Sequence, residues 1–104
     1  MTDLEMIKKC AEKMGYSIVA EPNAENEFKH TVLVNELRVG YCPLHDDAQA
    51  MALVKKLRLS IDTYEVGQWR VYTEELATLH GTMFCADGDD LNRAIVECVA
   101  KLDN

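Results

Sequence analysis

Two cysteines and two histidines are the residue types in this chain that most suggest a metal site. Cys42 and His45 lie close together, and His80 lies a few positions before Cys85. A structural zinc site needs four cysteine or histidine ligands at short, paired spacings. The first pair fits that pattern loosely and the second does not fit it well. We therefore expect no metal, and interpret these residues as a loop that enters a helix and an ordinary strand cysteine.

Two groups of aspartates could instead support acid–base chemistry or bind calcium. Asp46 and Asp47 follow His45, but Asp46 is expected to cap a helix and Asp47 to lie in its first turn, where a carboxylate interacts favourably with the helix dipole. The segment Asp87–Asp90 is similar to a fragment of an EF-hand. The twelfth position of a calcium loop is a glutamate, and counting from Asp87 this position is Cys98. Both groups are therefore predicted to be structural.

Nucleophilic catalysis has no support in the order of the residues. The chain shows no Ser-His-Asp arrangement, no glycine-rich phosphate loop and no cysteine in a recognised nucleophile context. Its four cysteines are widely spaced, and Cys10 and Cys98 lie within apolar helical stripes, as small core residues do. We expect free thiols in a reducing compartment. The sequence predicts a protein that is not an enzyme, with no catalytic residue and no cofactor.

The net charge of −7, from 18 acidic and 11 basic side chains, limits the class of partner. Direct binding to a nucleic-acid backbone needs a surplus of Lys and Arg, and this chain has a deficit. No segment approaches the ~20 apolar residues of a membrane span, and Asp3 and Glu5 stand where a signal peptide is basic. We therefore expect a cytoplasmic protein that binds neither nucleic acid nor membrane and prefers partners with basic surfaces.

The acidic side chains are concentrated in segments that connect the predicted elements. Connecting segments usually lie on the surface and tolerate functional charge. Against a basic partner, such charges would speed association and make it sensitive to salt. We predict that the partner-facing surface includes Glu21, Glu25, Glu27, Glu74, Glu75, Asp87, Asp89 and Asp90.

Three segments with apolar residues at helical spacing must position these charges. The first is Asp3–Met14. We expect Thr2 and Glu5 to form a capping box at its start and Gly15 to end it. The second follows Asp46, and the last follows Asp87–Asp90, whose carboxylates are expected at its positive end. The predicted buried faces are Ala50, Leu53, Val54 and Leu57 in the second helix and Leu91, Ala94, Ile95, Cys98, Val99 and Leu102 in the last.

The remaining segments read as strands. We predict strands at Tyr16–Ala20, Thr31–Val34, Leu37–Tyr41, near Tyr64–Thr73 and at Leu79–Cys85, with a bulge or tight turn at Asn35-Glu36. Leaving aside the short strand at 16–20, the predicted order is α-β-β-α-β-β-α. Alternation directs Trp69 toward the core and Arg70 and Tyr72 to the other face. The fold class is α+β: a short, mainly antiparallel sheet with helices packed on it, in a single domain over residues 1–104.

Several stretches of the chain combine helix caps and core positions in a recognisable pattern. They are Thr2–Leu4, Tyr41–Ala50 followed by Leu53–Lys56, the Trp69-Arg70 pair within a strand, and Asp90–Ile95 at the start of the last helix. Together these stretches resemble the bacteriophage α-β-α (ABA) sandwich domain family, over nearly the whole chain. Family members commonly have Asn before the proline, where this chain has Cys42.

The resemblance implies a small accessory phage protein in the bacterial cytoplasm that has no enzyme activity and binds a host protein. An acidic surface suits an inhibitor of host defence, of the anti-CRISPR or anti-restriction type, that occupies a nucleic-acid channel. Two alternatives stay open. A large exposed apolar patch would favour a homo-oligomeric structural or regulatory phage protein, and a pocket with convergent polar groups would favour a small nucleotide-binding protein.

Overall fold

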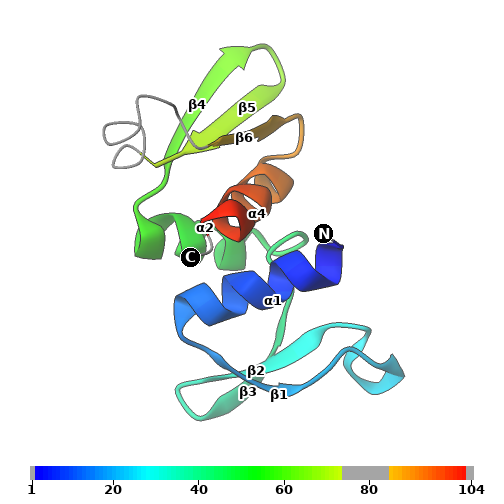
Figure 1. Ribbon diagram of the computed structural model, residues 1–104. Coiled ribbons are helices and arrows are strands. Elements are labelled where there is room, and N and C mark those ends of the chain that lie inside the picture. The colour runs from blue at the N-terminus through cyan, green and yellow to red at the C-terminus, as the bar shows by residue number, and fades with distance from the viewer. Residues whose placement is uncertain (1, 74–84, 103–104) are drawn as a thin grey trace.

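The computed structural model describes residues 2–73 and 85–102 of the chain, and Figure 1 shows their arrangement. Its helices are α1 (Asp3–Met14), α2 (Asp47–Leu57) and α4 (Leu91–Lys101), with the short 3-10 helix η1 (Ala24–Asn26). Its strands are β1 (Ser17–Ala20), β2 (His30–Val34), β3 (Leu37–Tyr41), β4 (Ser60–Glu65), β5 (Gln68–Tyr72) and β6 (Cys85–Gly88). The predicted α+β class, with helices packed on antiparallel sheet, is confirmed.

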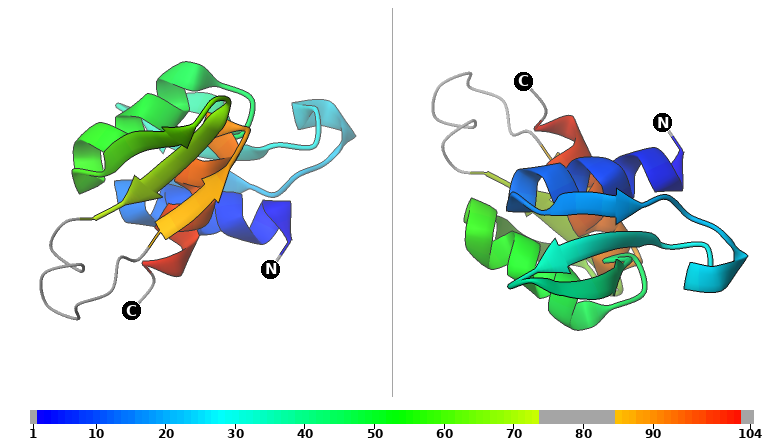
Figure 2. Two further views of the ribbon diagram at one scale, coloured as in Figure 1. Left: turned by 90° about the horizontal axis from the view of Figure 1, so that it is seen from above. Right: turned by 90° about the horizontal axis from the view of Figure 1, so that it is seen from below.

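The described strands form two antiparallel meanders with the helices between them. The first sheet has the order β1-β2-β3, and the second sheet has the order β4-β5-β6. The first sheet contacts α1, whereas the second sheet contacts α4 through β5 and β6 (Figures 1 and 2). The first sheet contains the predicted strand at 16–20 as β1, although the predicted order left it out, whereas the second sheet has one strand more than was predicted. The molecule is elongated, at 42 × 28 × 24 Å.

The first sheet closes on a two-residue hairpin turn, as the sequence predicted. Asn35 and Glu36 both have positive φ, at 51° and 68°, and Val34 pairs directly with Leu37 across the strands. Two consecutive left-handed residues match the twist of the flanking strands, which is why such short turns are favoured. The side chains then alternate, so that Val32 and Tyr41 are buried and Leu33 and Arg38 are exposed.

The second sheet corrects the predicted strand at Tyr64–Thr73. This segment crosses a hairpin: β4 ends at Glu65, and β5 starts at Gln68 after a turn in which Gly67 has φ +79°. The sequence prediction was wrong here because the glycine that the turn requires was read as part of one strand. It also missed most of β4, since the Ser60–Thr63 part of that strand carries polar residues on its open face.

The last strand and the last cap also differ from the prediction. Within the described residues, the strand before α4 is Cys85–Gly88 rather than Leu79–Cys85, whose first six positions lie outside them. Asp87 and Gly88 are therefore strand residues. Asp90 alone acts as the N-cap of α4, because its Oδ1 accepts a hydrogen bond of 3.1 Å from the Arg93 backbone N–H.

The capping signals of the other helices are confirmed at the level of single bonds. The Thr2 hydroxyl accepts from the Glu5 backbone N–H at 3.2 Å and donates to Glu5 Oε1 at 3.1 Å. Asp46 accepts from the Gln49 backbone N–H at 3.0 Å. Gly15 ends α1 in the left-handed conformation, with φ 79°. These short-range interactions fix the helix starts, and α1 has the predicted bounds.

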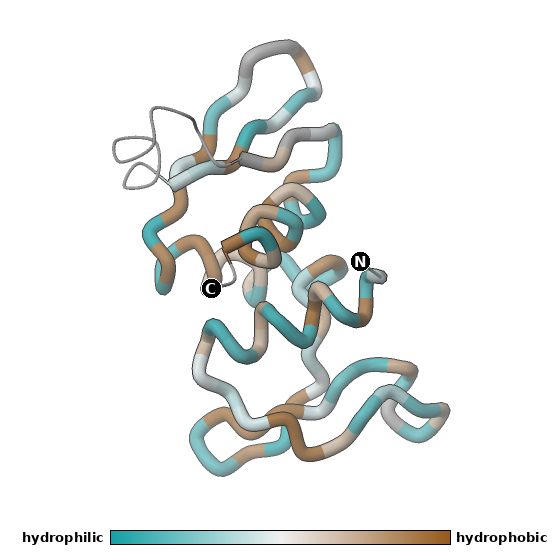
Figure 3. Tube along the Cα trace, viewed as in Figure 1, coloured by the Kyte–Doolittle hydropathy of each residue, from teal (hydrophilic) through white to brown (hydrophobic). Residues whose placement is uncertain are grey.

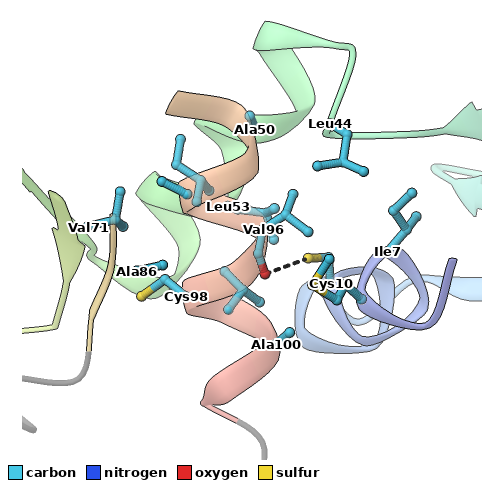
Figure 4. Close-up of a cluster of buried hydrophobic side chains, with 14 of the residues drawn as sticks. Ile7, Cys10, Leu44, Ala50, Leu53, Val71, Ala86, Val96, Cys98 and Ala100 are labelled. Carbon is cyan, nitrogen blue, oxygen red and sulfur yellow. Dashed lines mark hydrogen bonds between the residues drawn. The ribbon is translucent and has the colours of Figure 1, made fainter. Parts of the chain in front are cut away.

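Helix α4 forms the centre of the core. Its apolar stripe is buried, with Ile95, Val96 and Val99 fully inaccessible to solvent, and it contacts α1, α2, β5 and β6. Figure 4 shows Ile7 and Cys10 of α1 on one side of this helix and Val71 and Ala86 of the second sheet on the other. The core is therefore organised around the last helix, on which both earlier halves of the chain pack.

Candidate functional site

The first turns of the three long helices meet on one side of the molecule. The Arg93 guanidinium of α4 donates to both carboxylate oxygens of Asp3 in α1, at 3.2 and 2.9 Å. Asn92 Nδ2 of α4 donates to Asp47 Oδ1 of α2 at 2.8 Å. Each helix start carries partial positive charge from its free N–H groups, so acidic side chains gather there. The elements that position these carboxylates are therefore the helix starts themselves.

Between the starts of α2 and α4 lies an open depression of about 660 Å³, called here the acidic hollow. Its lining combines carboxylates with apolar side chains: it consists of Asp47, Met51, Asp89, Asp90, Leu91 and Asn92. Met51 is 39% exposed, so part of its apolar side chain is accessible to a partner. The hollow thus offers an acidic rim next to an apolar wall.

The three aspartates of the hollow differ in how strongly the fold engages them. Asp90 caps α4 and Asp47 accepts from Asn92. Asp89 is exposed, and among residues 2–73 and 85–102 its carboxylate has no hydrogen bond or ion pair. Asp89 is therefore the negative charge in the hollow that is most available to a partner.

Arg93, in the first turn of α4, directs its guanidinium hydrogen bonds to α1. Besides the Asp3 contacts, its Nη1 lies 3.8 Å from Glu97 Oε1. The Arg93 hydrogen bonds hold the pKa of the Asp3 carboxyl below its ordinary value, and Asp3 in turn raises the pKa of Arg93. This ion pair joins two helices at the surface, and Arg93 also interacts electrostatically with Asp90 of the hollow, which leaves Asp89 as the carboxylate there without a hydrogen-bonded or charged partner among the described residues.

The acidic segment between β1 and β2 is a separate surface from the hollow. It is mainly hydrophilic in Figure 3, and Glu21, Glu25 and Glu27 are all exposed. Glu21 Oε2 lies 3.3 Å from His30 Nδ1, and Glu27 lies 3.4 Å from Lys29 Nζ. Only the Glu25 side chain has no partner among the described residues. Two of these three predicted carboxylates therefore have partners at the start of β2 or directly before it.

The remaining predicted site residues are placed in part. Glu74 and Glu75 lie outside the described residues. The Asp87 backbone lies in β6, opposite Arg70. The structure thus brings Asp89 and Asp90 together and adds Asp47 and Met51, which were not predicted. The Asn92–Asp47 contact unites residues 45 positions apart, and helix-capping patterns in the sequence carry no signal for it.

The Cys42–His45 segment forms the entry to α2. Gln49 binds this segment, because its Oε1 accepts from the Cys42 N–H at 2.7 Å and its Nε2 donates to the Gly40 carbonyl at 2.9 Å. His45 is exposed. Within the described part of the chain, no group of three or more His, Cys, Asp or Glu could hold a metal ion. Of the imagined zinc ligands, His80 lies outside that part.

The environment of the buried Cys10 thiol does not suit a nucleophile. Burial raises the pKa of Cys10 to about 12, and its Sγ contacts the Val96 carbonyl at 3.9 Å (Figure 4). A thiol held neutral in this way is a packing residue.

On the open face of the second sheet, the Tyr72 hydroxyl donates to Asp62 Oδ2 at 2.7 Å. Trp69 is half-buried on the face it shares with buried Val71.

Two comparisons with known proteins give no relative for this chain. No protein-family model matches it, and no curated protein is significantly similar to it in sequence. None of the helices within residues 2–73 and 85–102 is long and apolar enough to cross a membrane.

Proposed function

We propose that this chain is a non-enzymatic binding module that holds a basic side chain of a partner protein in the acidic hollow. The observation that supports it is the pairing of unneutralised Asp89 with the exposed apolar surface of Met51 in one depression. A lysine or arginine has an aliphatic stem and a charged head, so both parts of such a side chain find a matching surface there.

The partner class in this proposal is a host or phage protein with a basic surface. The net charge of −7 favours such a partner and opposes nucleic acid and anionic lipid. The resemblance to phage proteins extends the proposal to an accessory phage protein of the bacterial cytoplasm that inhibits a host defence system of the CRISPR or restriction type. In that role the acidic hollow would engage basic residues of a nucleic-acid channel, without a cofactor.

The test replaces Asp89 by lysine and measures binding of a hexa-arginine peptide by the NMR shifts of the Met51 methyl group. Asp89 is not the cap of α4, so Asp89→Lys should leave the fold intact while placing a cation in the hollow. We expect the peptide to shift Met51 in the wild type at low salt, less so at high salt, and hardly at all in Asp89→Lys. The same variants then show whether capture of partners from a bacterial lysate follows the peptide result.

The matched control is Glu12→Lys, which makes the same change of charge at an exposed position of α1. If binding depends on the hollow, Glu12→Lys retains most of the peptide response. Equal losses in the two variants would show that net charge alone attracts the peptide, and the hollow would then have no specific role.

A further inference from the structure

A second depression, called here the α2 groove, lies where the first sheet meets α2. It has a volume of about 230 Å³ and is mainly apolar. Val34 and Val39 come from the β2–β3 hairpin, and Ala48 and Ala52 come from α2. Because the helix presents small alanines to the sheet, it leaves space over these valines that residues 2–73 and 85–102 do not fill. The α2 groove and the acidic hollow have no lining residue in common.

A large apolar side chain stands exposed beside this groove. Leu37 pairs with Val34 across the hairpin and lies two positions from Val39, so alternation places it on the same face as both valines. It is nevertheless 68% exposed. The hairpin therefore carries an unfilled apolar groove and, at its rim, an apolar side chain that is not buried in it.

Opposite charges flank this leucine along the chain. Glu36 and Arg38 are both exposed, and neither makes a side-chain hydrogen bond or an ion pair with another residue in the described ranges. Two antiparallel copies of the segment Glu36-Leu37-Arg38 would place each glutamate next to the arginine of the other copy. The segment is thus complementary to itself, as an interface with two-fold symmetry requires.

Within the described part of the chain, the edge of β3 is covered at its Cys42 end and open at its hairpin end. Toward Cys42 the edge is covered by the Gln49 amide, which bonds the Gly40 carbonyl and the Cys42 N–H. An unpaired strand edge is a template for pairing with another chain, and a side chain bonded along it prevents this. No such cover exists among the described residues at Leu37 and Arg38, so an association is confined to the hairpin end.

We propose that two copies of this chain associate about a two-fold axis through their β2–β3 hairpins. The two hairpin ends pair edge to edge: on the groove face, Leu37 of each copy packs against Leu37 and the rim of the α2 groove of the other, and on the opposite face Glu36 and Arg38 form reciprocal ion pairs across the axis. The contact is small compared with the ~1,600 Å² of a stable interface, so the dimer is weak and forms on concentration. This inference is independent of the acidic hollow and of any partner that binds there.

The test is sedimentation velocity of the purified chain from about 10 µM to about 1 mM, the range in which an interface below standard size associates. The wild type is expected to shift from monomer to dimer across this range. Leu37→Asp removes an apolar contact twice per dimer and should raise the dissociation constant more than about 100-fold. Val66→Asp, at the exposed turn of the second sheet, is the matched control and should dimerise as the wild type does.

Charge exchange tests the geometry. Glu36→Arg and Arg38→Glu should each be monomeric, because like charges then meet at the axis. A mixture of these two variants restores opposite charges at both contacts and should form a heterodimer, and so should the doubly exchanged chain with itself. A wild type that stays monomeric at all concentrations, a dimer that survives Leu37→Asp, or a mixture that does not associate would overturn the proposal. Asp89→Lys should dimerise normally, which separates this result from that of the hollow.

Discussion

The two sheets of this protein have the same topology, but different helices pack on them. Each is a three-stranded antiparallel meander within the described residues. In the second sheet, α4 packs across β5 and β6, so Val71 and Ala86 are buried. In the first sheet, α1 contacts β1 and β2, while Leu37 at the hairpin end of β3 is exposed. Alternating sequences thus give similar strands, and the position of the helices decides which apolar face is available for binding.

The largest expected effect comes from the helix that covers the second sheet. Ile95 is fully buried at the centre of α4, so Ile95→Asp places an unpaired charge in the core and should cost several kcal/mol or prevent folding. Leu37→Asp, the same chemical change on the open face, should leave the melting temperature almost unchanged. Circular dichroism melts of the two variants provide the comparison, and a stable Ile95→Asp protein would show that this face of α4 is not in the core.

A milder pair of substitutions compares the two sheets directly. Val71→Ala in the second sheet removes buried methyl groups and should lower the free energy of unfolding by about 2 kcal/mol. Val39→Ala in the first sheet removes the same atoms from a half-buried side chain beside the α2 groove, and should cost less than about 1 kcal/mol. Urea unfolding measures both values. Equal costs would mean that the groove is filled in solution.

Alkaline pH should weaken the core between α1 and α4. Burial raises the pKa of Cys10 from 9.0 to about 12, so its neutral form is favoured in the folded state. Stability is therefore complete below pH 9 and falls as pH rises toward 12, by up to about 1.4 kcal/mol per pH unit for this one proton. Urea unfolding of the wild type and of Cys10→Ala at several pH values checks this, and an unchanged slope in the variant would assign the loss to other groups.

A count of reactive thiols tests the prediction that the cysteines are free. All four cysteines should react with a thiol reagent under denaturing conditions, since the sequence predicts free thiols. In the folded protein, Cys10 and Cys98 should react slowly because both are buried, and half-buried Cys42 should react faster. Fewer than four reactive thiols in denaturant, or stoichiometric zinc in the purified protein, would contradict the prediction.

The smallest effect on stability is expected at the acidic loop of the first sheet. Glu25 and Glu27 are exposed, so reversing both to lysine should change the free energy of unfolding by about 0.5 kcal/mol or less. If this loop contributes to the partner-facing surface, the reversal should weaken partner capture at low salt. Reversal of Glu74 and Glu75 is the parallel test. Unchanged capture at low and high salt in both variants would restrict the proposed surface to the acidic hollow.

The sequence was most informative where a local interaction determines the structure. The bounds of α1, the caps Asp46 and Asp90, and the Asn35-Glu36 turn were predictable because each depends on residues at most a few positions apart. The β4–β5 hairpin was missed because Gly67 was not recognised as its turn. The sequence also did not predict which sheet faces the helices cover, since this depends on where α4 packs.

The candidate site likewise contains residues that the sequence predicted and residues that it did not. Asp89 and Asp90 were predicted as surface charges from the polarity of their segment, and they do line the hollow. Asp47 was interpreted only as a first-turn carboxylate, and Met51 was not considered. Both become site residues through a tertiary contact of α2 with Asn92 of α4. A prediction from sequence would have needed the packing of these two helices first.

The central place of α4 also has a consequence for how the chain is made. Strands and turns of the first 73 residues need only neighbours in sequence, and so can pair while the chain is being synthesised. Helices α1 and α2 and the second sheet, however, pack on α4, and Lys13 Nζ of α1 donates to the Leu102 carbonyl at 3.1 Å. Such contacts between distant parts of the chain form late. A ribosome-bound chain that lacks α4 therefore exposes the faces of α1 and of the second sheet that this helix covers, and stable folding waits until α4 has left the exit tunnel.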